Sequence, residues 1–176
     1  NHYKKFGKFA YTAKLRNGLF RNTGACLSPQ TAFYNLIGME TLGLRMERAC
    51  ENAMNLAKYI DSIDGIIVKY PGLESSKWHE KADKVLKNGY GTILTIRVGS
   101  KERAFDIMDR LTIPLIVSNI GDTKTLIVHP SSTLNVHSSE QEKKDANVFD
   151  DMIRISVGIE DIEDLIEDFD RVLKEN

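Results

Sequence analysis

Residues 28–60 carry an apolar pattern longer than a helix of a small domain needs, and it limits the folds open to the chain. Ser28 suits a helix N-cap, and Pro29 suits the first turn, where its missing N–H costs nothing. Apolar residues then recur at spacings of three and four as far as Ile60, and others lie off this stripe. A continuous helix of this length would measure about 45–50 Å. We therefore expect a helix that joins two bodies, or that packs against something outside the chain.

After Gly65 the apolar segments become shorter and alternate in type. Period-two alternation predicts five strands, at 66–70, 92–98, 115–118, 125–128 and 152–157. Helical spacing predicts helices at 75–87, 100–111 and 160–174, with a short one at 139–145. The third and fourth strands lie on either side of a turn at Gly121-Asp122. This order predicts an α+β domain: a mainly antiparallel sheet of four or five strands with helices on one face, preceded by the long helix.

The chain divides by pattern into three segments. Residues 1–27 are basic and mixed, and they predict a helical piece that ends near Gly18 or Gly24 without a core of its own. Residues 28–62 form the predicted inter-domain helix, and residues 63–176 form the α+β domain. With 176 residues, the chain is long enough for one domain and an appendage.

Composition excludes several classes of function. The formal net charge is −1, so overall charge gives no reason to expect nucleic acid or an anionic membrane as a partner. No apolar run approaches the roughly 20 residues that span a bilayer. The two cysteines, Cys26 and Cys50, do not make a disulfide framework, which favours a reducing, cytoplasmic location.

Familiar catalytic signatures are absent from the sequence. The four histidines do not occur at metal-ligand spacing, and no nucleophile elbow, phosphate-binding loop or dinucleotide fingerprint is present. The acidic run at 160–170 fits the solvated face of an amphipathic helix better than a pair of catalytic carboxylates. We therefore predict no metal site and no catalytic residue from these motifs.

Arg154 lies in the middle of the last strand and allows two interpretations. Alternation places Ile153, Ile155 and Val157 on one face and Met152, Arg154 and Ser156 on the other. In the first interpretation, Arg154 is an ordinary exposed residue on the wet face of a sheet. In the second, its guanidinium binds a carboxylate, because two parallel N–H donors match the two carboxylate oxygens and the charge does not titrate. Ser118 and Asn119 lie where another strand ends, a suitable place for hydrogen bonds to a ligand.

Four segments carry a resemblance to a known family: "LSPQTAFYNLIGMETLGLRMERACENA" (27–53), "KYPGL" (69–73), "SNIGDTKTLIVHPSST" (118–133) and "IRISVGIEDIEDLIEDF" (153–169). Together they resemble the C-terminal part of Cys/Met-metabolism enzymes, which depend on pyridoxal phosphate (PLP) and have the fold-type I architecture. Within that family the chain is most similar to O-acetylhomoserine sulfhydrylases. The Glu-Thr-Leu at 40–42, the Asn-x-Gly-Asp at 119–122 and the helical segment before the long helix all resemble that group.

The resemblance implies a fold and roles for individual residues. Arg154 matches the family arginine that binds the α-carboxylate of an amino-acid substrate, and Ser118 matches a serine that helps to hold the same group. Asn119 joins them as a substrate-binding candidate. The long helix would link a large PLP-binding domain, absent here, to this small domain, with residues 1–27 on the large-domain side. The implied reaction is that of a PLP-dependent transferase: an O-acetyl or O-succinyl group leaves homoserine, and sulfide adds to give homocysteine.

The sequence departs from the family in one important way. The family's Schiff-base lysine, in a Ser-x-x-Lys segment, lies upstream of everything matched here. Lys14 superficially resembles it but lies in a basic helical segment without small residues around it. We therefore expect a C-terminal fragment that neither binds PLP covalently nor turns over substrate alone. Its expected partners are the acyl-homoserine substrate, the missing large domain and further copies of the parent enzyme, with a tetramer expected.

Two alternatives remain open at this point. Within the family, methionine γ-lyase and cystathionine γ-synthase domains share the quoted motifs in outline. Outside the enzymes, a free-standing module could use the same sheet face to bind a small carboxylate or to assemble with a partner subunit.

Overall fold

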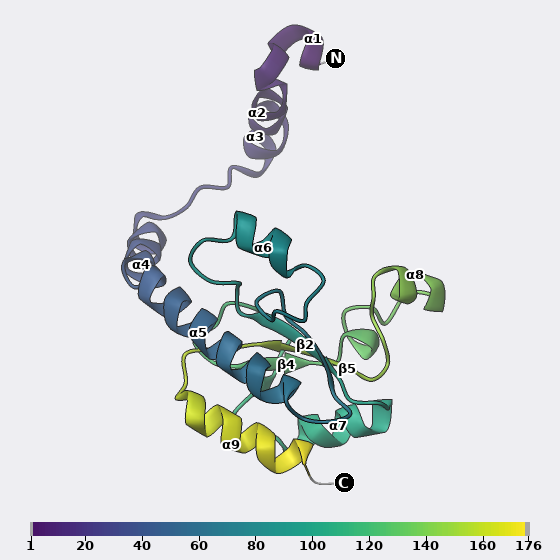
Figure 1. Ribbon diagram of the computed structural model, residues 1–176. Helices are drawn as coiled ribbons and strands as arrows, with labels where there is room; N and C mark the ends of the chain where they lie inside the picture. The colour runs from purple at the N-terminus through teal and green to yellow at the C-terminus, as the bar shows by residue number, and fades with distance from the viewer. Residues whose placement is uncertain (1, 175–176) are drawn as a thin grey trace. The chain divides into compact units, whose positions relative to one another are not determined.

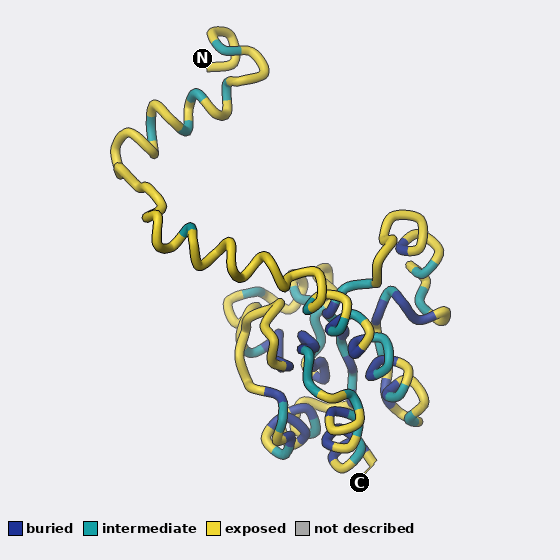
Figure 2. Tube along the Cα trace, turned by 90° about the vertical axis from the view of Figure 1, so that its left-hand side faces the viewer, coloured by how far each residue is buried: buried dark blue, intermediate teal, exposed yellow. Residues whose placement is uncertain are grey.

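The computed structural model describes residues 2–174, which fall into two compact units that divide between Thr41 and Leu42. Figure 2 shows that the buried residues belong to the second unit, whereas the first is exposed or half-buried along its whole length. None of the helices within residues 2–174 is both long and apolar enough to cross a bilayer.

The N-terminal unit is helical and has no core. Its elements are, in chain order, α1 (His2–Phe6), the 3-10 turn η1 (Gly7–Phe9), α2 (Ala10–Leu15), the π-helical η2 (Arg16–Phe20), α3 (Arg21–Thr23) and α4 (Pro29–Glu40). None of them buries a residue. The predicted end at Gly24 is confirmed, since this glycine has φ +61°, a left-handed conformation that other residues avoid. Ser28 caps α4 by accepting a hydrogen bond from the Thr31 N–H at 3.1 Å.

The prediction of one continuous helix from 28 to 60 is wrong. The chain leaves helical geometry at Thr41, where φ is −103° and ψ is 1°, and a second helix, α5 (Leu42–Asp61), begins directly afterwards. Gly38 and Gly43 lie on either side of the interruption. Because glycine costs about 1 kcal/mol more than alanine inside a helix, this stretch is the weakest part of the pattern.

The C-terminal unit is built on a five-stranded sheet with the strand order β1-β2-β5-β4-β3. Its strands are β1 (Ile67–Lys69), β2 (Ile93–Arg97), β3 (Leu115–Ile116), β4 (Leu126–Val128) and β5 (Met152–Ser156). Three neighbouring pairs are antiparallel, but β3 and β4 are parallel, with Leu115 opposite Leu126. The sheet is therefore mixed. Residues 117–125 do not form a hairpin around Gly121; they carry the chain back so that β4 runs in the same direction as β3.

Three helices cover one face of this sheet: α5, α7 (Lys101–Arg110) and α9 (Ile162–Leu173), as Figure 1 shows. Their apolar stripes meet Leu94, Ile96, Ile153, Ile155 and Val157 in a single core. Burying each of these side chains contributes about 1.5–3 kcal/mol. The predicted alternation of β5 is thus confirmed, with Ile155 fully buried and Arg154 on the opposite face.

Capping side chains mark the N-terminal ends of three helices of the C-terminal unit. Ser100 caps α7, Ser139 forms a capping box with Glu142 at α8 (Glu140–Asp145), and Asp161 caps α9. The helix predicted at 75–87 is shorter than expected. It is α6 (His79–Val85), its N-cap is Trp78 rather than a serine, and turns that include Ser76 N–H to Leu73 O occupy the preceding residues.

The acidic run at 160–170 is only partly a solvated face. Glu160 accepts hydrogen bonds from the backbone N–H and the hydroxyl of Thr125, and Asp168 is 5% exposed. Asp168 accepts bonds from Thr112 N–H, Ile113 N–H and Arg171, so it fixes the segment between α7 and β3. Asp164 and Glu167 are exposed, as expected. The prediction that the whole run faces solvent is therefore wrong at Asp168.

Candidate functional site

Arg154 lies on the sheet face opposite the helices, and its guanidinium is only partly hydrogen-bonded. Arg154 is half-buried, and its Nε is buried without a hydrogen-bond partner among the described residues. One donor is used: Nη2 donates to the backbone carbonyl of Asn119 at 3.2 Å. Arg154 is therefore not the ordinary exposed residue of the first interpretation, because the backbone carbonyl of Asn119 contacts its guanidinium. A buried N–H without an acceptor is costly, so an added acceptor at the Nε of Arg154 would be stabilising.

Backbone and hydroxyl groups hold residues 119–125 against the end of β5. The buried Ser156 hydroxyl accepts from Gly121 N–H at 3.2 Å, and Ile159 N–H donates to the carbonyl of Thr123 at 2.9 Å. Gly158 lies so close to the Thr123 carbonyl that a Cβ there would collide with it. These contacts explain why a glycine ends β5, and they place the Ser118-Asn119 junction beside Arg154.

The structure thus brings together two of the three predicted substrate-binding residues through a hydrogen bond. The backbone carbonyl of Asn119 accepts the hydrogen bond from Arg154, and Asn119 as a whole is exposed to solvent. Ser118 is the adjacent residue and is also exposed. A backbone contact of this kind has no side-chain signature, so sequence reasoning could place Asn119 near the site but could not find the interaction.

A cavity of about 340 Å³ opens beside Arg154 on this face. Its lining residues are Lys69, Thr95, Pro130, Leu134, Asn135, Ala146, Asn147, Val148, Met152 and Arg154. None of them is acidic, and two are cationic. The 130–148 segment forms one wall and the sheet forms the floor, so an anionic ligand of small size would meet positive charge and no repulsion.

Arg97 lies on the same face but its charge is already compensated. Its Nε donates to Asp151 Oδ1 at 2.8 Å, and its guanidinium carbon lies 4.0 Å from the centre of the Phe149 ring. Asp151 also accepts from Gly99 N–H at 3.3 Å. Arg97 is therefore a structural residue, whereas no carboxylate among the described residues forms a salt bridge with Arg154.

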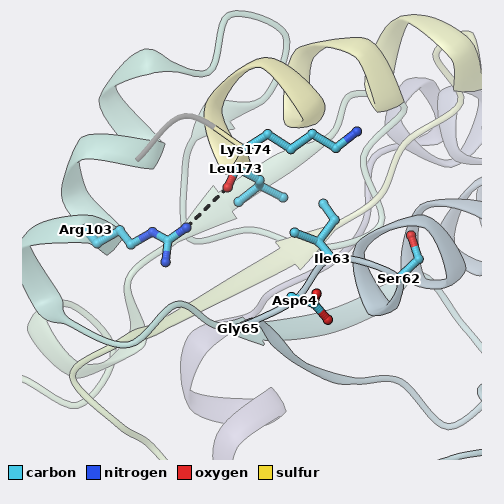
Figure 3. Close-up of a pocket in the computed structure, with 7 residues that line it drawn as sticks. All are labelled: Ser62, Ile63, Asp64, Gly65, Arg103, Leu173 and Lys174. Atoms are coloured by element: carbon cyan, nitrogen blue, oxygen red, sulfur yellow. Dashed lines mark hydrogen bonds between the residues drawn. The ribbon is translucent and has the colours of Figure 1, made fainter.

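A larger cavity of about 600 Å³ lies elsewhere, between the end of α5 and the end of α9 (Figure 3). Its arginine, Arg103, donates from Nη2 to the Leu173 carbonyl at 3.2 Å and from Nη1 to the Val98 carbonyl at 3.3 Å. These bonds close the C-terminal end of α9, where a positive charge also complements the helix dipole. Because the guanidinium of Arg103 is already hydrogen-bonded to two backbone carbonyls, we do not place a ligand site here.

His129 is buried, and both of its ring nitrogens form hydrogen bonds within the fold. Its Nε2 lies 2.7 Å from the Asp150 carbonyl, which can only accept, so Nε2 donates and Nδ1 accepts from Ser132 N–H at 3.2 Å. The hydroxyl of Ser131 donates to Asp150 and holds the pKa of that carboxyl below its ordinary value. Within residues 2–174 no group of three His, Cys, Asp or Glu side chains is arranged to hold a metal ion.

None of the described lysines is buried, as a lysine that forms a Schiff base with PLP often is. Such a lysine is activated by desolvation or by a neighbouring cation. Lys14 is exposed on α2, and Lys69 is exposed with its ammonium 5.3 Å from the centre of the Phe149 ring. Lys143, the half-buried one, pairs with Glu140 at 3.1 Å.

Comparison with known proteins gives one consistent result. The family model described as Cys/Met metabolism PLP-dependent enzyme matches residues 5–174. A sulfhydrylase of Fusarium oxysporum, FUB7, is 41% identical over 172 residues, which is 97% of this chain and 40% of that protein. The O-acetyl-L-homoserine sulfhydrylase 1 of Thermus thermophilus is 40% identical, over 91% of this chain and 38% of its own length.

A solved structure agrees with these relatives. The O-acetylhomoserine sulfhydrylase of Wolinella succinogenes superimposes with a TM-score of 0.77 at 36% identity, covering 98% of this chain and 46% of that one. This chain thus spans about 40% of the length of the curated relatives named here.

Proposed function

The chain belongs to the family of Cys/Met metabolism PLP-dependent enzymes, and we propose that its C-terminal unit is the domain that binds the substrate α-carboxylate in a γ-replacement transferase. The proposed reaction releases an acyl group from O-acetylhomoserine or O-succinylhomoserine and adds sulfide to give homocysteine. PLP, when bound in the parent enzyme, would supply the electron sink. We further propose that residues outside this chain carry the cofactor and its lysine, so that the chain is inactive alone.

The observation that carries this proposal is the state of Arg154. A fixed positive charge stands on a rigid strand, with its Nε buried and unpartnered and with no carboxylate bound among the described residues. A substrate carboxylate supplies two acceptors in the geometry that a guanidinium offers. Because the stem of Arg154 is held by β5 and its Nη2 by Asn119, little side-chain freedom remains to be lost on binding.

Ser118 and Asn119 have supporting roles in this proposal. The Asn119 carbonyl accepts a hydrogen bond from the guanidinium of Arg154 and would orient it. The Ser118 hydroxyl would donate to the same carboxylate. We also propose that the exposed apolar residues of α4 face the large domain or another subunit of an oligomeric parent enzyme. Those with the largest exposed area include Phe33, Tyr34, Leu36 and Met39.

The names of the relatives favour a sulfhydrylase over the other members of the family. The Fusarium and Thermus proteins are both named as sulfhydrylases. Methionine γ-lyase and cystathionine γ-synthase domains remain the alternatives within the family. In a parent enzyme, product formation with sulfide but not with cysteine as the nucleophile would support the sulfhydrylase, and the reverse would support the synthase.

Binding of substrate to this chain tests the proposed role of Arg154. We expect O-acetyl-L-homoserine to bind with a Kd of about millimolar, and Arg154→Lys to weaken it, because an ammonium cannot reproduce the guanidinium fork. Arg48→Lys is the matched control, since Arg48 lies on α5 and pairs only loosely with Glu51, at 4.0 Å. Equal affinity of the Arg154→Lys variant and the unaltered chain would contradict the assignment.

A second experiment tests where the cofactor is held. The chain is mixed with PLP, reduced with borohydride and analysed by mass spectrometry. We expect no lysine to be labelled stoichiometrically. Complete labelling of a single lysine would show that the chain carries its own cofactor attachment site.

A further inference from the structure

The segment that brings Ser118 and Asn119 to Arg154 is not anchored by apolar side chains of its own. Residues 117–124 are all exposed, although the Asn119 carbonyl accepts a hydrogen bond from Arg154 Nη2 at 3.2 Å. A segment that buries so little side-chain surface is held by its polar contacts. The position of the Asn119 carbonyl therefore depends on the hydrogen bonds that fix this segment to the rest of the domain.

Thr125 follows this segment, is fully buried and fixes it to the loop after β5. Its hydroxyl donates to Glu160 Oε2 at 2.9 Å and accepts from Gly158 N–H at 2.9 Å. Its backbone N–H donates to the other carboxylate oxygen of Glu160. Next to it, Ile159 N–H donates to the Thr123 carbonyl at 2.9 Å. The segment before β4 and the loop after β5 thus form one hydrogen-bonded unit.

Asn52 holds the same loop from the helix-covered side of the sheet. It lies on α5 and is fully buried, and its Nδ2 donates to the carbonyls of Gly158 at 3.1 Å and Glu160 at 2.8 Å. One amide nitrogen with two N–H groups suits two carbonyls. Its Oδ1 is also buried and has no hydrogen-bond partner among the described residues. An unsatisfied buried oxygen costs stability, so this arrangement points to a role for Asn52 in setting where the loop lies.

We propose that a network of three positioning residues holds the guanidinium of Arg154 in its binding geometry. The three are Asn52, Glu160 and Thr125. Their hydrogen bonds run across the end of the sheet, from α5 on one face to the Asn119 carbonyl on the other. The inference rests on the proposed function of Arg154 and adds the residues that prepare it for a ligand. A guanidinium already held in place loses little freedom on binding, so loosening the network should weaken binding although none of the three touches the ligand.

Thr125→Val tests this most directly, because it removes the hydroxyl and keeps the shape of the side chain. In ¹⁵N-labelled, ligand-free samples, we expect this variant to shift the Nε–H resonance of Arg154. In calorimetric titration it should weaken binding of O-acetyl-L-homoserine about fivefold, the effect of one net hydrogen bond on an equilibrium constant. Thr125→Ser keeps the hydroxyl and should restore both the resonance and the affinity.

Asn52→Leu tests the other end of the network and should act in the same direction as Thr125→Val. Either variant alone is sufficient should the other fail to fold. Thr112→Val is the matched control, because the Thr112 hydroxyl also donates to a carboxylate, Asp168 Oδ1, at 2.9 Å, but lies outside the network. Thr125→Val and Thr112→Val should both lower the midpoint of urea denaturation. Only Thr125→Val should change the Arg154 resonance and the affinity.

The outcomes separate this inference from the proposed function. Unchanged affinity in Thr125→Val and Asn52→Leu, while Arg154→Met abolishes binding, overturns the positioning network and leaves the proposed function of Arg154 in place. An equal effect of Thr112→Val on the affinity overturns the network as well, because general destabilisation would then explain the loss. If the network variants shift the Arg154 resonance but Arg154→Met leaves the affinity unchanged, the network is supported and the proposed function of Arg154 fails.

Discussion

Successive side chains of each strand point to opposite faces of the sheet in the C-terminal unit, and the two faces differ: one forms the core and the other carries the candidate site. The face toward α5, α7 and α9 carries apolar side chains such as Ile96, Ile153 and Ile155, all fully buried. The opposite face carries Arg97 and, lining a cavity, Lys69, Thr95, Met152 and Arg154. Successive residues of β5 therefore contribute alternately to stability and to the candidate site, so substitutions on the two faces should have separable effects.

Truncation on the helix-covered face should have the largest effect on stability. Ile155→Ala removes a fully buried side chain from the centre of the core and should lower the free energy of unfolding by about 3–4 kcal/mol. Urea denaturation followed by circular dichroism measures this loss. Ile67→Ala is the matched control, because Ile67 lies on edge strand β1 and is 54% exposed. Losses of equal size in the two variants would contradict the position of the core.

The next largest effect should come from Asp168, which anchors the segment between α7 and β3. Asp168→Asn should lower the free energy of unfolding by about 2–3 kcal/mol, because hydrogen bonds from Thr112, Ile113 and Arg171 lose their charged acceptor. Asp164→Asn on the exposed side of α9 should change it by less than about 0.5 kcal/mol. Denaturation midpoints of the two variants make the comparison.

Asp168 also predicts a pH dependence. Burial raises the pKa of its carboxyl, but hydrogen bonds from Ile113, Arg171 and Thr112 outweigh this and hold the pKa below its ordinary value of 3.8. The folded state then binds fewer protons than the unfolded state, so this stabilisation is complete above about pH 4 and is lost as the pH falls through the lowered pKa. Denaturation between pH 6 and pH 2 should show a smaller acid loss in Asp168→Asn than in the unaltered chain, and an identical loss would contradict the assignment.

The ion pair between Arg97 and Asp151, on the sheet face opposite the helices, should contribute less to stability than the core does. Asp151→Asn leaves Arg97 without its charged partner and should lower the free energy of unfolding by about 1–2 kcal/mol. The control is Asp106→Asn, which breaks a pair with Arg110 on the surface of α7, with an expected loss of about 0.3–0.5 kcal/mol. If Asp151→Asn lowers the free energy of unfolding no more than Asp106→Asn does, the pair between Arg97 and Asp151 does not stabilise the fold as expected.

The smallest effect on stability is expected at Arg154 itself. Arg154→Met removes a buried Nε that has no partner, so the free energy of unfolding should change by less than about 0.5 kcal/mol. Binding of O-acetyl-L-homoserine should nevertheless be lost. A stability loss comparable to that of Ile155→Ala would show that Arg154 is a structural residue and not a ligand group.

The parts of this fold that could be predicted are those set by local periodicity and local side chains. The alternation of β5 placed Arg154 opposite the core, and Ser28, Ser100 and Gly24 marked helix ends that the structure has. These features depend only on neighbouring residues, so a single sequence contains them.

The parts that could not be predicted depend on partners distant in the chain. Nothing in 115–118 or 125–128 states that β3 and β4 run parallel, because both directions use the same apolar residues. The burial of Asp168 could have been predicted, because its position falls on the apolar stripe of α9 with Leu165 and Val172. We did not predict it because Asp168 lies in a run of acidic residues that are mostly exposed. The Asn119 contact uses a carbonyl that every residue has.

The central claim is that Arg154 binds the substrate carboxylate, and its side-chain NMR signal tests this most directly. In a ¹⁵N-labelled sample of the chain, the Nε–H resonance of Arg154 is followed as O-acetyl-L-homoserine is added. We expect a saturable shift of this resonance, and we expect the corresponding resonance of Arg97, already paired with Asp151, to stay in place. A saturating shift at Arg97 with none at Arg154 would contradict the account.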